Sequence, residues 1–443
     1  MRTALLISLA LLSLLALGRP MRARAEAAPE PAERRLDNGM CVVLCQRSDV
    51  PLVAVDLYVN AGSARESTEA PGAAHLLEHL FFRTPLSALA PKLGWNLPPA
   101  AWGVGEGLEI LGAEADAQTT RDFTHYYFEV PASSLTDALR LLAAAAFHLR
   151  VEQATLDLEK AILASELRAL ASPTTRLESL LYAATFGDQG YGRPTGGSEE
   201  SIAALSTIQV TDYYDSNYKP NNMVLVLVGD LAPEPGFAAA KDAFGGQKLW
   251  PLNPEPYSPQ ARAPALATTA SPDAFSYAAV GWLAPGASEP ADVAALDVLR
   301  FLLGEGEGAR ARESLAARGA RPVQVGASFL THRNPSLFWV WAKTQKDNLE
   351  ATQAALADLG LGLQTSAPTA AEVARARDQY EASFAYANLS LLGEAATLGF
   401  HYVLGAPAPA AYEQWIDSVS AEDLCRVAKR YLDPRRCVIA RLE

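Results

Sequence analysis

Apolar residues fall into two kinds of pattern along the chain. In some stretches they alternate with polar residues or form short unbroken runs, as β-strands do. The predicted strands of the first half are residues 41–47, 52–62, 124–131 and 222–230. In other stretches apolar positions recur every three to four residues, which predicts helices, chiefly over 134–149 and 156–171. Strands and helices are interspersed, so the pattern favours a mixed α+β fold.

The second half repeats this order of elements. Residues 275–285 read as a strand, residues 291–304 as a helix that ends at Gly304, and residues 338–344 as a further strand. We therefore expect two similar domains from an internal duplication, each a mainly antiparallel sheet packed with helices.

The ends of the two halves also match. Thr207 precedes Tyr218 by eleven residues, and Ser420 precedes Tyr431 by the same interval. Each Tyr is followed by a proline-containing turn and an apolar strand. We expect each hydroxyl residue to cap a helix.

Domain boundaries follow from composition. Residues 250–264 have the proline density of a linker. We therefore expect an N-terminal domain over 26–249, which would hold any metal site, and a homologous C-terminal domain over 265–443. Residues 1–25 combine a cationic start, an apolar run and a small-x-small end, as an export signal does. The alternative is an uncleaved N-terminal anchor. Cleavage would place the protein in the periplasm or outside the cell, with no stable membrane span.

Charge excludes one class of partner. The formal net charge is −13, and no basic run interrupts it, which argues against nucleic-acid binding. The composition is compatible with basic or neutral peptides as substrates.

Four cysteines leave the redox state open. Cys41 and Cys45 share one face of a predicted strand but lie too far apart to bridge. Cys425 lies on a predicted helix and Cys437 on the strand after it, so these two can bridge. Buried free thiols are an equally good interpretation.

The segment AAHLLEHLFF, residues 73–82, holds two of the six histidines. On a helix, His75 and His79 point the same way, with Glu78 beside them. Two imidazoles at this spacing can hold one zinc ion, and the neighbouring carboxylate can reach a zinc-bound water. Metal binding would offset the cost of placing polar groups among leucines. The alternative is a pair of surface histidines.

A catalytic zinc needs a third protein ligand and an open position. Glu159 and Glu166 lie seven residues apart, so they share one face of the predicted helix 156–171. One can bind the metal while the other orients a ligand. Spacing alone does not choose between them, and both can be ordinary surface carboxylates.

These residues resemble a known family. His-x-x-Glu-His, followed by a helix in which one Glu precedes another by seven residues, is similar to the inverted zinc motif of the pitrilysin/insulinase metallopeptidases. The similarity covers nearly all of the chain after residue 25 and is to the half-length branch, which includes mitochondrial processing peptidase subunits and bacterial relatives. It implies one zinc per chain on His75, His79 and Glu166. It also implies Glu78 as general base and Glu159 as the carboxylate that orients a ligand.

The resemblance also implies how substrate binds. The family adds a peptide as a strand to a sheet edge near the metal, which here matches Ala115, Asp116, Ala117 and Thr119. Relatives usually have Asn where this chain has Asp116. Glu166 follows His79 by more residues than is usual, and an insertion within 87–107 accounts for the difference.

A second departure concerns the C-terminal half. Relatives carry an Arg and a Tyr there that contact the substrate carbonyl. Arg310 matches the Arg, with Arg312 a near competitor, but the Tyr position falls at Pro322. Loss of such a donor typically costs about 100-fold or more in rate. We therefore expect a heterodimer with a homologous zinc-less subunit rather than a homodimer.

The sequence thus predicts an exported zinc metalloendopeptidase that hydrolyses peptides or unfolded segments. The alternative is a non-catalytic peptide-binding or assembly subunit that keeps the fold.

Overall fold

The computed structural model describes residues 30–86, 102–251, 265–304 and 308–443. The predicted export signal, most of the predicted linker and most of the segment 87–107 lie outside the described residues. Residues 31–443 group into one unit by their contacts. The proposed domain boundaries inside this unit therefore stay a prediction.

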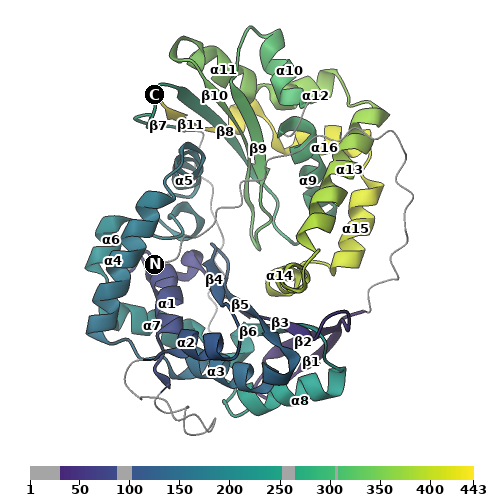
Figure 1. The fold of residues 1–443 in the computed structure, drawn as a ribbon. Helices are drawn as coiled ribbons and strands as arrows, with labels where there is room; N and C mark the ends of the chain where they lie inside the picture. The colour runs from purple at the N-terminus through teal and green to yellow at the C-terminus, as the bar shows by residue number, and fades with distance from the viewer. Residues whose placement is uncertain (1–29, 87–101, 252–264, 305–307) are drawn as a thin grey trace. The chain divides into compact units, whose positions relative to one another are not determined.

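The first half forms a six-stranded sheet with the order β1-β2-β6-β3-β5-β4 (Figure 1). Its strands are β1 Ala32–Arg35, β2 Cys41–Gln46, β3 Leu52–Val59, β4 Asp116–Thr119, β5 Thr124–Pro131 and β6 Met223–Gly229. The pair β2–β6 is parallel and the other pairs are antiparallel. Strand β4 forms one edge of this sheet.

The second half forms a five-stranded sheet with the order β7-β11-β8-β10-β9. Its strands are β7 Leu266–Thr269, β8 Ser276–Ala284, β9 Gln324–Phe329, β10 Ser336–Thr344 and β11 Val438–Leu442. Here β7–β11 is the parallel pair. Without β1, the first sheet has the same order and the same single parallel pair. The expected duplication and the α+β class are confirmed by this topology.

Helices pack against both sheets. Those of the first half are α1 Ala73–Phe82, α2 Val104–Ile110, α3 Leu135–His148, α4 Gln153–Ala169, α5 Pro173–Phe186, α6 Glu199–Ala204, α7 Thr207–Asn217 and α8 Pro233–Phe244. Those of the second half are α9 Pro290–Gly304, α10 Arg310–Ala317, α11 Leu349–Ala357, α12 Leu359–Thr365, α13 Ala370–Ala387, α14 Leu391–Leu404, α15 Pro409–Ser418 and α16 Ala421–Tyr431. The helix expected over 291–304 ends at Gly304, as predicted.

Each half lends one helix to the other. Helix α14 packs on β3 and β6 of the first sheet, while α5 packs on β7, β8 and β11 of the second (Figure 1). Gly399 on α14 makes this approach possible, because a Cβ there would lie 2.0 Å from the ring of Tyr58 on β3. The Tyr58 hydroxyl donates to the carbonyl of Ala396, 3.0 Å away. The periodicity of the sequence did not reveal this exchange.

Both matching helices near the ends of the halves are capped by serine. Ser420 accepts the backbone N–H of Asp423 and caps α16, as predicted. For α7 the prediction was wrong by one residue, because Ser206 caps the helix and Thr207 is its first residue. In α7, Gln209 returns a bond to the backbone N–H of Ser206, which satisfies a further unpaired donor of the first turn.

All four cysteines are free thiols in the structure. Cys425 donates to the carbonyl of Leu363 and Cys437 to that of Pro434, so the bridge between them is absent. None of the helices in the part of the chain that the structure describes combines the length and the apolar composition that a membrane span requires.

Candidate metal centre

Helix α1 carries the His-x-x-Glu-His segment into the first half of the molecule. Leu76, Leu77 and Leu80 are buried and hold the helix against the core. Gly72 directly precedes the first residue of the helix, and its φ of +93° suits glycine. The carboxylate of Glu66 accepts the N–H of Ala74, 2.9 Å away, and so satisfies a free donor at the start of the helix. Burial raises the pKa of Glu66 to about 8.

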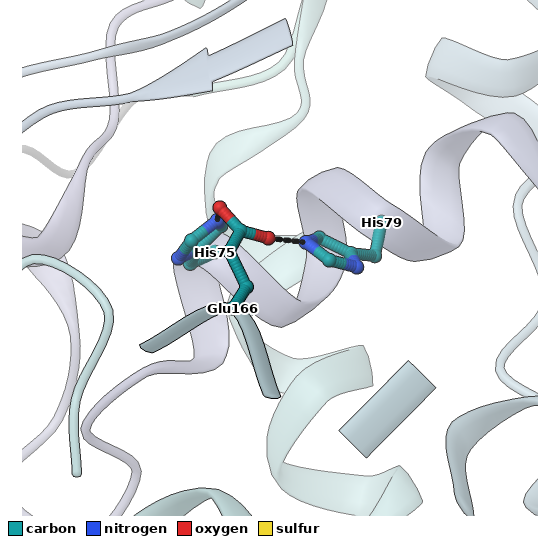
Figure 2. A group of neighbouring side chains, drawn as sticks. All are labelled: His75, His79 and Glu166. Carbon is teal, nitrogen blue, oxygen red and sulfur yellow. Dashed lines mark ion pairs between the residues drawn. The ribbon is translucent and has the colours of Figure 1, made fainter. Parts of the chain in front are cut away.

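Three predicted ligands converge. The Nε2 atom of His79 lies 3.3 Å from Oε2 of Glu166, and Nε2 of His75 lies 3.7 Å from Oε1 of the same carboxylate (Figure 2). One ligand atom from each residue lies within 4.8 Å of the others. Glu166 comes from α4, which packs on α1. The structure therefore brings together residues that lie 87 positions or more apart in the sequence.

This donor set fits zinc. Two imidazole nitrogens and one carboxylate oxygen are a common ligand set of catalytic zinc, and zinc keeps a fourth position for water or substrate. Ligands bonded to zinc at about 2.0–2.1 Å in a tetrahedron lie roughly 3.3 Å from one another. The two nitrogen–oxygen separations between the histidines and Glu166, 3.3 and 3.7 Å, are near that value. Glu166 retains 39% of its side-chain exposure, which leaves the site open on one side.

Glu159 orients His79 from the other side of the ring. Its Oε2 lies 3.2 Å from Nδ1 of His79, and its Oε1 accepts Nε–H of Arg83 at 2.7 Å. A carboxylate at Nδ1 keeps the proton there, so that Nε2 presents its lone pair. Helix spacing left Glu159 and Glu166 interchangeable, and the structure separates them: Glu166 faces Nε2 of both rings and Glu159 faces Nδ1.

The two histidines have opposite electrostatic environments. Burial, together with the neighbouring His79, lowers the pKa of His75 to about 4. Burial also acts to lower the pKa of His79, but hydrogen bonds to Glu159 and Glu166 outweigh it and raise that pKa to about 9. The hydrogen bond between His79 and Glu166, together with the charges of both imidazoles, lowers the pKa of Glu166. The carboxylates on both sides of His79 therefore favour a positive charge at its ring, and a metal ion between the two rings and Glu166 would supply such a charge.

Glu78 lies on the adjacent face of α1 and is buried. Its Oε2 accepts the hydroxyl of Thr119 at 2.5 Å, and the Thr119 oxygen also lies 3.2 Å from that of Thr124. Burial raises the pKa of Glu78 to about 7, although the bond from Thr119 opposes this. A carboxylate with a pKa near neutrality is suited to accept and return a proton.

The site opens into a cavity of about 1210 Å³. His75, Glu78 and Glu166 line it, together with Asp116, Ala117 and Thr119 of the edge strand β4. Ala115, the remaining residue predicted for this edge, directly precedes β4, packs against the hydrophobic core of the first half and is not among the described residues that line the cavity. The cavity thus joins the candidate metal ligands to an open strand edge.

Arg310 lies elsewhere, at the start of α10. Its guanidinium binds both carboxylate oxygens of Glu372, at 2.6 and 3.0 Å, and donates to the carbonyls of Ser366 and Ala367. It is not among the described residues that line the cavity. Pro322 precedes β9 in the same half. The predicted substrate contact of Arg310 stays a prediction.

Sequence reasoning missed three residues that support the centre. Arg83 holds Glu159, and its position four residues after His79 is a helical signal that points to this face. Glu66 binds the start of α1. Gly196 packs on His75, since a Cβ there would lie 3.0 Å from Nδ1. Glu66 lies only eight residues before Ala74, whereas Gly196 is distant from His75 in sequence, and no periodic pattern marks either contact.

Two family models match the chain. The model described as Insulinase (Peptidase family M16) matches residues 41–199, and the model described as Peptidase M16 inactive domain matches residues 205–380. The first contains α1, β4 and α4, and therefore all the candidate ligands.

Curated relatives carry two kinds of name. An uncharacterized zinc protease of Mycobacterium tuberculosis is 29% identical over 232 residues, which are 52% of this chain and 50% of that protein. Cytochrome b-c1 complex subunit 1 of Bos taurus is 28% identical over 222 residues, 50% of this chain and 44% of that protein. These alignments span about half the length of the curated relatives.

Solved structures show the same fold. A protease from Helicobacter pylori superposes with a TM-score of 0.83 at 22% identity, covering 94% of this chain and 100% of that chain. A peptidase M16 inactive domain from Pseudomonas fluorescens gives 0.81 at 19% identity, covering 93% and 97%. With the two matching models, the duplicated topology and the inverted His-x-x-Glu-His helix, this chain belongs to the insulinase family of peptidases, family M16, in its half-length branch.

Proposed function

We propose that the protein is an exported zinc metalloendopeptidase that hydrolyses peptides or unfolded segments. One observation carries the proposal: two imidazoles and a carboxylate meet beside a buried glutamate, in a cavity edged by an open strand. Relatives named as zinc proteases support it.

His75, His79 and Glu166 would hold one zinc ion per chain. The metal, when bound, would polarise the scissile carbonyl and lower the pKa of its water. Glu159 keeps His79 in the tautomer that binds through Nε2, and Arg83 holds Glu159 in place. His79 therefore already presents Nε2 toward Glu166.

Glu78 would move the proton. Its carboxylate would accept a proton from the attacking water and pass it to the leaving amine. The hydroxyl of Thr119 donates to Glu78 and fixes the orientation of its carboxylate relative to β4. A substrate hydrogen-bonded to this edge would then lie next to the base.

Substrate would bind as an added strand on β4. The backbone groups of an edge strand recognise any extended peptide, because they read the main chain rather than the side chains. The size of the cavity is compatible with an extended segment. We propose peptides and unfolded chains as substrates for this reason.

Export and a partner complete the proposal. The composition of residues 1–25 supports export to the periplasm or the medium. Pro322, at the place where relatives carry a hydroxyl donor, supports a heterodimer in which a homologous zinc-less subunit supplies that donor. Arg310 is held by Glu372, which is a further reason to look for the donor on another chain.

A non-catalytic role is the second candidate. A relative that is a subunit of the cytochrome b-c1 complex, and the matching model described as an inactive domain, favour it. In that case the chain would hold peptides or assemble with other subunits and would cleave nothing.

The test uses the purified full chain. Zinc content by elemental analysis and cleavage of quenched peptides would be measured with and without a co-expressed homologue from the same genome. Glu78→Gln should retain one zinc and lose about 100- to 10,000-fold in kcat/KM, since only the proton transfer is removed. Glu109→Gln, which changes an exposed carboxylate on α2, is the matched control and should leave both readouts unchanged.

Each outcome decides between the candidates. Zinc without cleavage, alone and with the homologue, would favour the non-catalytic role. Loss of zinc in Glu78→Gln would show that Glu78 is a ligand rather than the base.

A further inference from the structure

Strand β4 has two different faces. Residues paired across β4 and β5 share a face, and the pairs are Asp116–Tyr127, Ala117–Tyr126, Gln118–His125 and Thr119–Thr124. Thr119 donates to Glu78, so Ala117 and Thr119 face the metal side. The opposite face carries Asp116, Gln118, His125 and Tyr127, and all four line the cavity.

Buried contacts hold His125, one of the residues of this opposite face. The Nδ1 atom of His125 lies 3.0 and 3.1 Å from the carboxylate oxygens of Asp56, whose side chain is only 1% exposed. The imidazole stacks on Tyr58 at 4.7 Å between ring centroids and lies 4.9 Å from Tyr127. A buried ion partner and two aromatic neighbours hold this ring in one orientation.

Helix α14 closes the other side of this face. The Tyr58 hydroxyl donates to the carbonyl of Ala396, and Leu392, Gly393 and Ala396 line the same cavity. These α14 residues offer only small or apolar side chains. The opposite face therefore looks onto uncharged residues of α14, while the one carboxylate of that helix, Glu394, pairs with Arg47.

Asp116 is the exposed charge of this face. Its Oδ1 accepts the N–H of Ala117 at 2.8 Å, and its Oδ2 accepts the Tyr127 hydroxyl at 3.3 Å. Among the described residues, no Lys, Arg or His forms an ion pair with Asp116. An exposed carboxylate beside an aromatic ring, with no cation of its own, is complementary to a cation from outside.

The arginines of the cavity come from other elements. Arg121 is paired with Glu178 at 2.7 Å, and Arg168 is paired with Glu199. Arg176, on α5, is exposed and forms no ion pair with Asp116. The negative charge of the opposite face is therefore not neutralised by the basic residues that share the cavity.

We propose that this face is a specificity subsite for a lysine or arginine side chain of the substrate. This inference rests on the proposed function, because it needs a peptide on the β4 edge. The aliphatic part of the side chain would lie along Tyr127 and α14, and its cationic end would pair with Asp116. An ammonium or guanidinium over a tyrosine ring gains a further cation–π contact.

The strand geometry predicts that the preference for lysine or arginine alternates along the substrate. Side chains of an added strand alternate between the two faces, so only every second residue reaches Asp116. Basic residues at the intervening positions would face the metal side instead. A general attraction of an acidic protein for basic peptides would not alternate in this way.

The experiment scans one lysine through a neutral quenched peptide, position by position, against norleucine, which has nearly the same shape without the charge. The zinc-loaded full chain should cleave lysine peptides about 5- to 10-fold faster in kcat/KM at alternate positions only. The same peptides would also be bound to the Glu78→Gln chain and followed by fluorescence anisotropy.

Variants locate the effect. Asp116→Asn should bring the lysine-to-norleucine ratio close to one at the favoured positions, and Tyr127→Leu should lower it in part. Asp212→Asn, an exposed aspartate on α7, is the control and should keep the ratio. The ratio of the two kcat/KM values is used because a general folding defect would lower the cleavage of both peptides equally.

Several results would overturn the subsite. These are equal rates for lysine and norleucine, a preference without alternation, a ratio that survives Asp116→Asn, or the absence of peptide binding. Failure of the protease proposal looks different: no peptide is cleaved, while the anisotropy data still report whether lysine binds better at alternate positions.

Discussion

The same joint between two helices occurs twice in this molecule, with opposite chemistry. In the first half α1 meets α4 through imidazoles and carboxylates, His79 with Glu159 and Glu166. In the second half α9, which follows β8 as α1 follows β3, packs on α13 through aromatic rings. There Phe301 lies 6.1 Å from Tyr380 between ring centroids.

The comparison separates fold from site. Helix α9 has no histidine, and its two aspartates, Asp292 and Asp297, bond to α16 and α15 rather than to α13. The rest of its buried surface is apolar, yet the helix occupies the same place in the topology. The fold thus does not need polar groups at this joint. Their presence in α1 costs desolvation that apolar contacts would avoid, and a metal ion bound by them would offset this cost.

The largest expected effect is on the polar joint. His79→Ala should reduce bound zinc from one per chain to nearly none and lower peptide cleavage about 1,000-fold or more, because a ligand is lost. Elemental analysis and kcat/KM are the readouts. His148→Ala, at the exposed end of α3, is the matched control. Retention of zinc by His79→Ala would contradict the assignment.

The apolar core around α9 should respond in stability instead. Leu299→Ala on α9 removes a fully buried side chain and should lower the free energy of unfolding by about 2–5 kcal/mol. Zinc content of the folded fraction should not change. Chemical denaturation measures the loss, with Leu361→Ala, 41% exposed, as control. If Leu299→Ala released zinc, the core of the second half and the metal centre would not be independent.

Glu159→Gln tests the orienting contact at a smaller scale. The amide keeps the shape of the side chain but weakens the bond to Nδ1 of His79, so zinc affinity should fall about 10- to 100-fold. Competition with a chelator measures the affinity. Glu152→Gln, an exposed residue just before α4, controls for the loss of a nearby charge. An unchanged affinity would mean that Arg83 and the fold alone position His79.

The smallest expected effect is on thermal stability and concerns Glu372, whose carboxylate pairs with Arg310 in the second half. The ion pair with Arg310 lowers the pKa of Glu372 to about 2 from an ordinary 4.5. A lowered pKa in the folded state stabilises the protein above about pH 4.5, and this contribution is lost as the pH falls toward 2. The Tm advantage of the native chain over Glu372→Gln should therefore shrink between pH 5 and pH 2.

Glu350→Gln, an exposed residue of α11, should show no such trend. Parallel pH profiles of the native chain and Glu372→Gln would contradict the role of this ion pair. They would also leave Arg310 available for the substrate contact that the family resemblance implies.

Local periodicity determined much of the fold. The strand over 124–131 and the end of the helix at Gly304 were read directly from alternation and helical spacing. The convergence of His75, Glu78 and His79 was equally accessible, since residues three and four apart share a helix face whatever the rest of the chain does. The duplication followed because two halves with one pattern fold to one topology.

Contacts between distant segments were decided only by the tertiary structure. Helix spacing placed Glu159 and Glu166 on one face, but the packing of α4 on α1 determined which one meets Nε2. The Asp56–His125 pair and the exchange of α5 and α14 join segments whose local patterns carry no sign of one another. A sequence pattern reports which face of an element is buried, whereas the partner on that face depends on the whole chain.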